Sequence, residues 1–148
     1  MMHIRPLHAC LLVAALGAGS VGSAALASVD LSPAPGGVYQ LKPGIYVARG
    51  SGCDAPANAA IRQYDGRGIA TAHSRACRAR VRTRQGSRYT VDQTCIDAGA
   101  GPGRRQTERQ QVLVRDALSF TQTIHGGSTT YSYCPVYQLP PDLRPAAR

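Results

Sequence analysis

The chain is poor in aromatic rings and in carboxylates. Its 148 residues include no tryptophan, one phenylalanine and seven tyrosines, and 17 basic side chains outnumber eight acidic ones, for a formal charge of +9. Glu108 is the only glutamate, so a catalytic pair of glutamates is excluded. Because large rings are scarce, the interior depends on Val, Ile, Leu and Tyr, and covalent cross-links gain importance for stability.

Metal-binding motifs are missing as well. The sequence contains no CxxC and no HxxxH pattern, and only His73 and His125 lie beyond the first 27 residues. A bound metal ion needs clustered ligands, so we predict no metal site, and no motif indicates another cofactor.

A nucleophile beside a general base is nearly absent. His73-Ser74 is the only adjacent pair of this kind, and the fold would have to bring Asp97 to it. Adjacency along the chain is weak evidence for a catalytic pair. We therefore interpret the segment as a surface loop and predict no catalytic residues. A small hydrolase-like enzyme centred on His73 is the alternative.

The first 27 residues are typical of a signal peptide. Arg5 precedes an apolar run from Ala9 to Ala18, and Ala25-Leu26-Ala27 forms a small-x-small cleavage site. We expect a mature chain that begins at Ser28, has no transmembrane span, and resides in the periplasm or outside the cell. An uncleaved membrane anchor is the alternative, but the Gly and Ser content of residues 17–23 disfavours it.

The remaining 121 residues are expected to form one domain. Residues 28–37, rich in Pro and Gly, predict a flexible leader. Residues 38–134 predict a single β domain. Residues 135–148, with Pro140, Pro141 and Pro145, predict a Pro-rich tail that cannot sustain a helix or join a ladder.

The β domain alternates apolar and polar residues, with turn residues every 8 to 12 positions. This pattern predicts an antiparallel meander. The predicted strands cover residues 38–41, 44–49, 61–64, 69–72, 76–83, 88–97, 106–115, 118–125 and 129–134. Because each hairpin needs one covered face, the all-β chain is expected to close into a small barrel or a folded-over sheet.

Four cysteines remain after signal cleavage, and strand geometry favours one pairing. A three-residue loop, Gln85-Gly86-Ser87, sets Cys77 opposite Cys95 on one face of a hairpin. A disulfide fits that position, which leaves Cys53 to bond with Cys134. Chain entropy gives about 3 kcal/mol for the short closure and about 4.5 kcal/mol for the long one.

Two alternatives to this register stay open. A two-residue turn would place the two hairpin cysteines on opposite faces. A shift by two residues is compatible with the weak points of the prediction, namely Gly86, which suits the last loop position better, and Gln93, which would lie on the inner face.

The strand from Cys77 to Arg84 has an arginine at every even position. Side chains alternate faces along a strand, so the four arginines are expected to share one face. The row consists of Arg78, Arg80, Arg82 and Arg84, and Arg88 follows on the next strand. We predict that these guanidinium groups bind an envelope protein or an anionic glycan.

The arginine row is also compatible with an interpretation that involves no ligand. A solvated face that discourages pairing of sheet edges is the alternative without a ligand. Nucleic acid is not expected as a partner, because export removes the usual target and no aromatic platform accompanies the arginines.

Short motifs in order along residues 44–134 carry a resemblance. They are Pro43-Gly44-Ile45-Tyr46-Val47, Cys53-Asp54, Cys77-Arg78-Ala79-Arg80-Val81, Tyr89-Thr90-Val91 to Cys95, and Tyr131-Ser132-Tyr133-Cys134. With them the chain resembles small exported four-cysteine proteins of Gram-negative bacteria. The shared motifs are structural, and the group brings no activity to carry over.

These observations together favour a non-enzymatic periplasmic or secreted β domain. It is expected to bind an envelope partner through the arginine row, as an inhibitor or an accessory protein would. A polyanion binder that acts outside the cell is a further interpretation.

Overall fold

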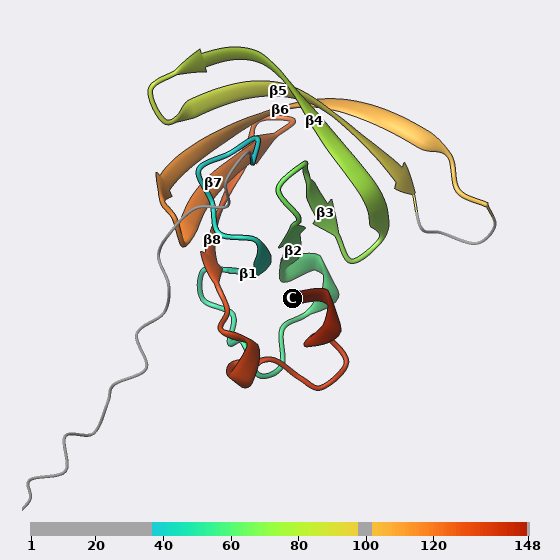
Figure 1. The fold of residues 1–148 in the computed structure, drawn as a ribbon, viewed down its shortest axis with the longest axis vertical. Helices are drawn as coiled ribbons and strands as arrows, with labels where there is room; N and C mark the ends of the chain where they lie inside the picture. The colour runs from blue at the N-terminus through green and yellow to red at the C-terminus, as the bar shows by residue number, and fades with distance from the viewer. Residues whose placement is uncertain (1–36, 98–101, 148) are drawn as a thin grey trace, which may run out of the picture.

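In the computed structural model, which describes residues 37–97 and 102–147, the chain forms one antiparallel sheet (Figure 1). The strands are β1 (Gly44–Ala48), β2 (Ile61–Tyr64), β3 (Ile69–Thr71), β4 (Ser74–Gln85), β5 (Arg88–Asp97), β6 (Arg105–Asp116), β7 (Ser119–Ile124) and β8 (Gly127–Tyr133). They pair in the order β3-β2-β1-β8-β7-β6-β5-β4, and the end strands β3 and β4 contact each other. The predicted all-β, nearly closed barrel is confirmed.

The segment predicted as the first strand, residues 38–41, lies inside the barrel and outside the sheet. Tyr39 and Leu41 are 1% and 0% exposed. The Tyr39 ring packs edge-on against Tyr89, with centroids 5.2 Å apart, and the Tyr39 N–H donates to the Tyr64 hydroxyl at 3.0 Å. The prediction was wrong because alternation indicates which side chains are buried, not whether their backbone joins a ladder.

The β4–β5 hairpin contains both the predicted register and the one that a two-residue turn produces. In its middle Val81 lies opposite Val91, as predicted. Nearer the end Arg84 lies opposite Tyr89, because Gly86-Ser87 form a two-residue turn with Gly86 at φ 58°. A bulge after Val81 absorbs the difference of one residue. The predicted three-residue loop is therefore wrong. Toward the cysteines the predicted register holds as far as Arg78, opposite Thr94, and a second irregularity follows between Arg75 and Arg78.

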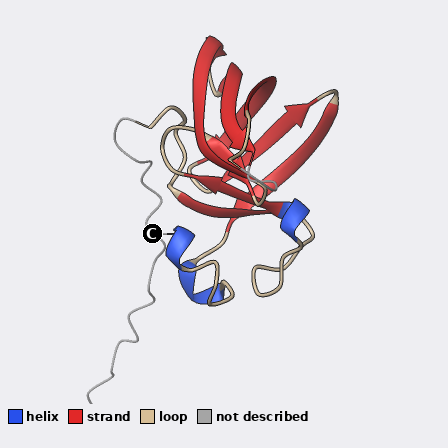
Figure 2. Cartoon of the chain, turned by 90° about the vertical axis from the view of Figure 1, so that its right-hand side faces the viewer, coloured by secondary structure: helices blue, strands red, loops and turns tan. Residues whose placement is uncertain are grey.

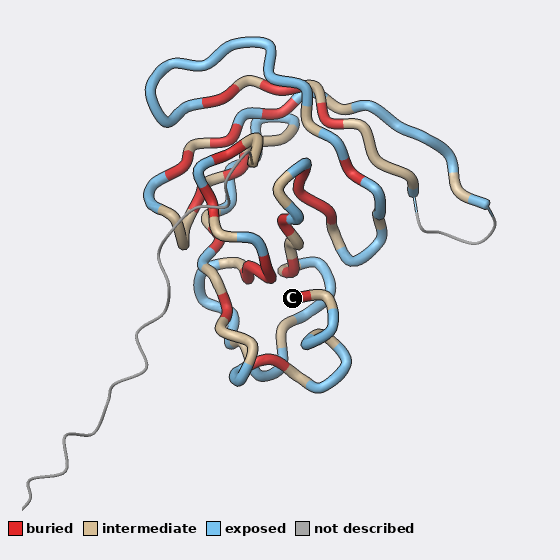
Figure 3. The backbone as a smooth tube through the Cα atoms, viewed as in Figure 1, coloured by how far each residue is buried: buried red, intermediate tan, exposed pale blue. Residues whose placement is uncertain are grey.

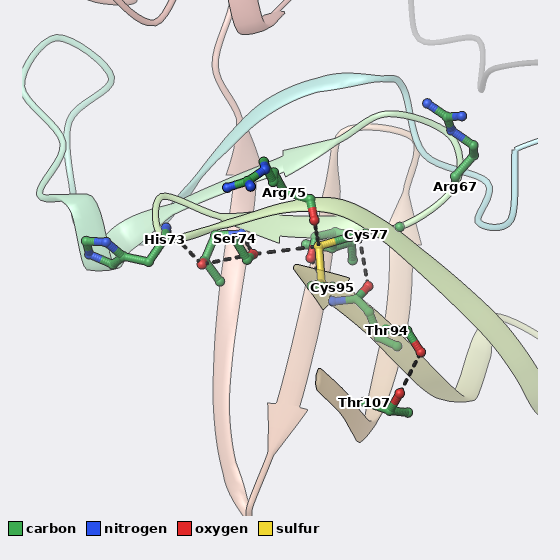
Figure 4. The surroundings of a disulfide bond; sticks show 12 residues. Arg67, His73, Ser74, Arg75, Cys77, Thr94, Cys95 and Thr107 are labelled. Carbon is green, nitrogen blue, oxygen red and sulfur yellow. Dashed lines mark hydrogen bonds between the residues drawn. A yellow bond between two sulfur atoms is a disulfide. The ribbon is translucent and has the colours of Figure 1, made fainter. Parts of the chain in front are cut away.

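Both predicted disulfides are present. Cys77 on β4 bonds to Cys95 on β5, with Cα atoms 4.1 Å apart (Figure 4). Cys53, in the loop after β1, bonds to Cys134 at the end of β8, with Cα atoms 5.7 Å apart. Two disulfides are typical of an oxidising compartment outside the cytoplasm. Within the described residues, no helix has the length and apolar character needed to cross a membrane.

Strands β3 and β4 close the barrel without forming a ladder of their own. The Ala79 N–H donates to the Arg67 carbonyl at 2.8 Å. Gln93 from β5 supplies two further hydrogen bonds at this closure. Its amide oxygen accepts from the Ile69 N–H at 2.8 Å, and its amide nitrogen donates to the Ile69 carbonyl at 2.7 Å. One side-chain amide thus satisfies the backbone groups of a buried residue where a neighbouring strand would otherwise be required.

Two apolar clusters stabilise the sheet from opposite sides. The cluster inside the barrel contains Tyr39, Leu41, Tyr46, Tyr64, Ile69, Tyr89, Val91, Val112, Val114, Phe120 and Tyr131. The cluster outside it contains Ile45, Val47, Ile61, Cys134, Leu139 and Ala147. The polypeptide therefore covers both faces of β1 and β2.

The Pro-rich C-terminal segment contributes to the outer cluster. It forms two short 3-10 turns, η2 (Val136–Gln138) and η3 (Pro145–Ala147), which lie beside the sheet together with η1 (Asn58–Ala60) (Figure 2). Leu139 is 1% exposed, and the Gln63 amide donates to the Ala146 carbonyl at 2.8 Å. The segment joins no ladder, but the folded unit extends through it as far as Ala147.

Candidate functional site

The outer face of β4, β5 and β6 carries a cluster of arginines around one carboxylate. Arg80 on β4 and Arg109 on β6 lie on either side of Asp92 on β5. Arg109 Nε contacts Asp92 Oδ1 at 2.8 Å, and Arg82 Nε contacts Asp92 Oδ2 at 3.3 Å. The hydrogen bond from Arg109, together with the charges of Arg109, Arg82 and Arg80, lowers the pKa of Asp92. We call Arg78, Arg80, Arg82 and Arg109 the arginine face.

Positive charge is in excess on this face. Strands β4, β5 and β6 contain four acidic residues, which are Asp92, Asp97, Glu108 and Asp116. Asp97 and Asp116 end their strands, and Glu108 lines a cavity on the other side of the sheet. The β4 arginines are exposed along the outer hairpin (Figure 3). One carboxylate therefore lies among four guanidinium groups.

The bulge in β4 removes Arg84 from the predicted row. Its guanidinium carbon lies over the Tyr89 ring, 5.0 Å from the centroid, and its Nε donates to the Gly86 carbonyl at 3.0 Å. Arg88 is exposed at the hairpin end, opposite Gln85. The prediction that Arg84 projects together with Arg78, Arg80 and Arg82 is wrong, because an inserted residue reverses the alternation of faces.

Sequence reasoning missed Arg109 as a member of this face. Its odd position on β6 places it beside Asp92 once the β5–β6 register is known. The alternation within residues 106–115 contained that signal. The register did not follow from it, because the connecting segment lies between two long strands without a short turn motif.

Inside the barrel, three neighbouring strands change from apolar to polar side chains, at positions staggered by two residues from one strand to the next. The change runs from Val91 to Gln93 on β5, from Val112 to Gln110 on β6, and from Phe120 to Gln122 on β7. Gln93, Gln110 and Gln122 are 8%, 2% and 4% exposed. We call these three residues the glutamine half of the interior, and Tyr39, Tyr46, Tyr64, Tyr89, Phe120 and Tyr131 the aromatic half.

A cavity of about 660 Å³ opens at the glutamine half. It is lined by Thr71, His73, Ser74, Gln93, Cys95, Asp97, Gln106, Thr107, Glu108, Arg109, Gln122, Ile124 and His125. Of these thirteen residues, only Cys95 and Ile124 are apolar. The volume lies within the range of small-molecule sites, and the lining provides many hydrogen-bonding groups.

The geometry does not join His73 and Ser74 into a catalytic pair. The Ser74 hydroxyl accepts from the Thr71 N–H at 2.9 Å and from the Thr71 hydroxyl at 3.1 Å, and the His73 ring extends away from Ser74 (Figure 4). These contacts stabilise the β3–β4 turn. A serine hydroxyl used in this way lacks the neighbouring base that nucleophilic catalysis requires.

His125 is held in an unusual conformation at the cavity edge. It occupies the β7–β8 turn with φ 49°, followed by Gly126 at φ 81°, which is typical of a type I′ turn. Its Nε2 lies 3.2 Å from Glu108 Oε1. Among the described residues, no group of three or more His, Cys, Asp or Glu side chains is suited to hold a metal ion.

A chain of hydrogen bonds connects Gln122 and Gln110 to a half-buried arginine. Arg62 lies over the Tyr131 ring, 4.7 Å from the centroid, and burial lowers its pKa. Its Nε donates to Gln122 Oε1 at 2.9 Å, and Gln122 Nε2 donates to Gln110 Oε1 at 2.5 Å. Within the described part of the chain, buried Gln110 Nε2 has no partner. An unsatisfied buried donor costs about 1–3 kcal/mol.

Comparisons with family models, with curated proteins and with solved structures found no match to this chain.

Proposed function

We propose that this protein is a non-enzymatic, exported β domain that binds an acidic surface of an envelope protein through the arginine face. The observation that carries the proposal is the ratio of charges: Arg78, Arg80, Arg82 and Arg109 surround Asp92 alone. A partner that supplies carboxylates would compensate the excess.

The arrangement of the guanidinium groups favours directed contacts over diffuse attraction. Asp92 accepts from Arg109 and lies within ion-pair distance of Arg82, which restrains both side chains on the outer face of the sheet. Arg82 and Arg109 nevertheless keep 44% and 66% of their side-chain surface exposed. Restrained arginine forks lose less entropy when they bind carboxylates, which adds to affinity.

Export is part of the same proposal. The apolar run that ends at Ala25-Leu26-Ala27 is typical of a cleaved signal, and two disulfides suit an oxidising compartment. The resemblance to small exported four-cysteine proteins of Gram-negative bacteria points in the same direction. Together they favour the periplasm or the cell exterior as the place of action.

A pair of charge-swap variants tests the proposal. Arg80→Glu with Arg82→Glu alters the arginine face, while Arg49→Glu with Arg67→Glu makes the same net change at exposed positions elsewhere. Each variant is titrated with a polyglutamate peptide, as a substitute for an acidic protein surface, and with dextran sulfate. Capture from envelope extract is measured at low and high salt in parallel.

We expect the arginine-face variant to bind polyglutamate about tenfold more weakly, and the control variant less than about threefold more weakly. Residual capture by the arginine-face variant should depend less on salt, because screening acts on the attraction that was removed. Equal losses in the two variants would show that only net charge matters. Binding of dextran sulfate without polyglutamate or envelope protein would identify an anionic glycan instead, and the protein partner would be rejected.

A further inference from the structure

The hydrogen-bond chain that begins at Arg62 has a fixed direction. A guanidinium group only donates hydrogen bonds, so Gln122 must present its oxygen to Arg62 Nε. Gln122 Nε2 then donates to the Gln110 oxygen. The Gln110 nitrogen is left at the end of the chain as a donor, and neither amide can be reversed without placing two donors or two acceptors face to face.

That terminal donor lies directly behind the wall of the cavity. Register on the inner faces of β5, β6 and β7 places Gln110 next to Val91 and Ile124, with Glu108 two residues away on the same face of β6. Glu108, Ile124 and Gln122 all line the cavity, and Gln110 is 2% exposed behind them. A buried, unpartnered amide N–H at this point is suited to an oxygen acceptor brought by a ligand.

Three groups at alternate positions of β6 provide complementary hydrogen-bonding functions. Gln110 provides a donor, Glu108 provides acceptor lone pairs, and the Gln106 amide provides both. A strand rises about 3.4 Å per residue, so the three span about 14 Å along one face. A ligand that meets all of them must carry several groups that both donate and accept.

Charge at the cavity is balanced. Glu108 lies 3.2 Å from His125, and the remaining lining contains both basic and acidic residues. Arg78, Arg80 and Arg82 of the arginine face lie outside the cavity lining, and Arg109 is the member of that face that also lines the cavity. The cavity therefore has no excess of one charge that would select an ionic ligand.

We propose that the glutamine half and its cavity form a binding site for a neutral oligosaccharide, in which Gln110 Nε2 donates to a sugar hydroxyl oxygen. Hydroxyl groups donate and accept, and they recur along such a ligand at intervals that the 14 Å row of side chains on β6 can follow. The site shares only Arg109 with the arginine face and does not depend on an anionic partner there.

Amide NMR spectra of the isotope-labelled, disulfide-bonded protein test the proposal. The protein is titrated with glucose, maltose and N,N′-diacetylchitobiose, and separately with acetate as an acceptor that lacks hydroxyl groups. Two variants are compared with the wild type. Gln110→Glu retains the oxygen that accepts from Gln122 and removes the donor, while Gln111→Glu makes the same charge change on the exposed outer face of β6.

We expect at least one disaccharide to shift the amide signals of Gln93, Gln110 and Gln122 in the wild type, while those of Arg78, Arg80 and Arg82 stay unchanged. Affinity should fall about tenfold or more in Gln110→Glu and stay within about twofold in Gln111→Glu. If Gln110→Glu fails to fold, the signal shifts of the wild-type protein still test the proposal.

Three outcomes would overturn the proposal. In the first, none of the three saccharides shifts the signals of the glutamine half. In the second, acetate shifts the same signals at lower concentration, which would make the site one for carboxylates. In the third, a folded Gln110→Glu variant binds saccharide as tightly as Gln111→Glu does, so that the Gln110 donor is not a contact.

Discussion

The aromatic and glutamine halves of the barrel interior differ in how their side chains are satisfied. In the aromatic half, Phe120 stacks on Tyr131 with centroids 5.2 Å apart, and the Tyr46 hydroxyl donates to the Lys42 carbonyl at 2.6 Å. In the glutamine half, side-chain amides bond to one another, and Gln110 retains a donor without a partner, as the Tyr39 hydroxyl does in the aromatic half. The first half gains stability from apolar burial, and the second gives up some of it while it lines a cavity.

The difference shows that a single strand can contribute both to apolar packing and to the lining of a cavity. Phe120 and Gln122 share the inner face of β7, two residues apart, and only the second lines the cavity. The same division separates Val91 from Gln93 on β5, whereas Gln110 on β6 is buried behind the cavity lining. A barrel of this size can therefore concentrate stability in one half and leave the other available for binding.

The largest expected effect compares these two neighbours on β7. Phe120→Ala should lower the free energy of unfolding by about 3–5 kcal/mol, because it leaves a cavity among packed rings. Gln122→Ala should cost about 1 kcal/mol, since it removes hydrogen bonds and little packing. Chemical denaturation of both variants measures the difference. Equal losses would mean that the two halves do not differ in their contribution to stability.

The Cys77–Cys95 disulfide links β4 to β5, one of the three strands that carry the glutamine half, where apolar packing is weakest. Replacing both cysteines by serine should lower the free energy of unfolding by about 3 kcal/mol, as expected for closure of a loop of 18 residues. Hydrogen exchange should accelerate most in β3, β4 and the adjoining part of β5. If exchange rose equally in β1 and β8, the cross-link would stabilise the whole barrel and not this half.

Gln93 differs from the other two glutamines because its hydrogen bonds to the Ile69 backbone help to close the barrel. Gln93→Leu leaves the N–H and carbonyl of buried Ile69 without partners and should cost about 2 kcal/mol. The same substitution at exposed Gln106 should change stability by less than about 0.5 kcal/mol. Urea titration of the two variants measures both values, and a small loss for Gln93→Leu would show that the barrel closes without this bridge.

Alkaline pH should destabilise the aromatic half specifically. Burial raises the pKa of Tyr39, Tyr46 and Tyr64 above the ordinary tyrosine value of about 10. Above that pH the unfolded chain loses these protons and the folded chain keeps them, so stability falls as pH rises, by up to about 1.4 kcal/mol per pH unit for each tyrosine. Denaturation midpoints measured from pH 9 to 11 should decline. A flat profile would indicate that the three hydroxyl groups ionise without unfolding.

Much of the sheet followed from the sequence because strand periodicity is local. Alternation located β1 to β8, and the position of Cys77 relative to Cys95 identified the disulfides. The bulge after Val81 was not predictable from alternation, since one inserted residue leaves the composition of both faces plausible. Tyr39 was assigned to a strand because its burial inside the barrel resembles that of an inward strand residue.

The sites were harder to predict than the sheet. The arginine row was visible in the sequence, but its final membership depended on the bulge, which removed Arg84, and on register, which added Arg109. Gln93 on the inner face was a sign that the interior is not uniformly apolar. Its meaning required Gln110 and Gln122 on the neighbouring strands, and that grouping arises only when the three strands are paired.

The central claim is that Gln110 and Gln122 are retained for binding and not for stability. The free energy of unfolding of the double variant Gln110→Leu/Gln122→Leu tests it most directly, because both partners of their hydrogen bond are replaced together and Arg62 keeps the carbonyls of Ala59 and Ile61. We predict a value within about 1 kcal/mol of the wild type, since a satisfied apolar pair can substitute for a polar pair at little cost. A loss as large as that of Phe120→Ala would contradict the account and make the two glutamines structural.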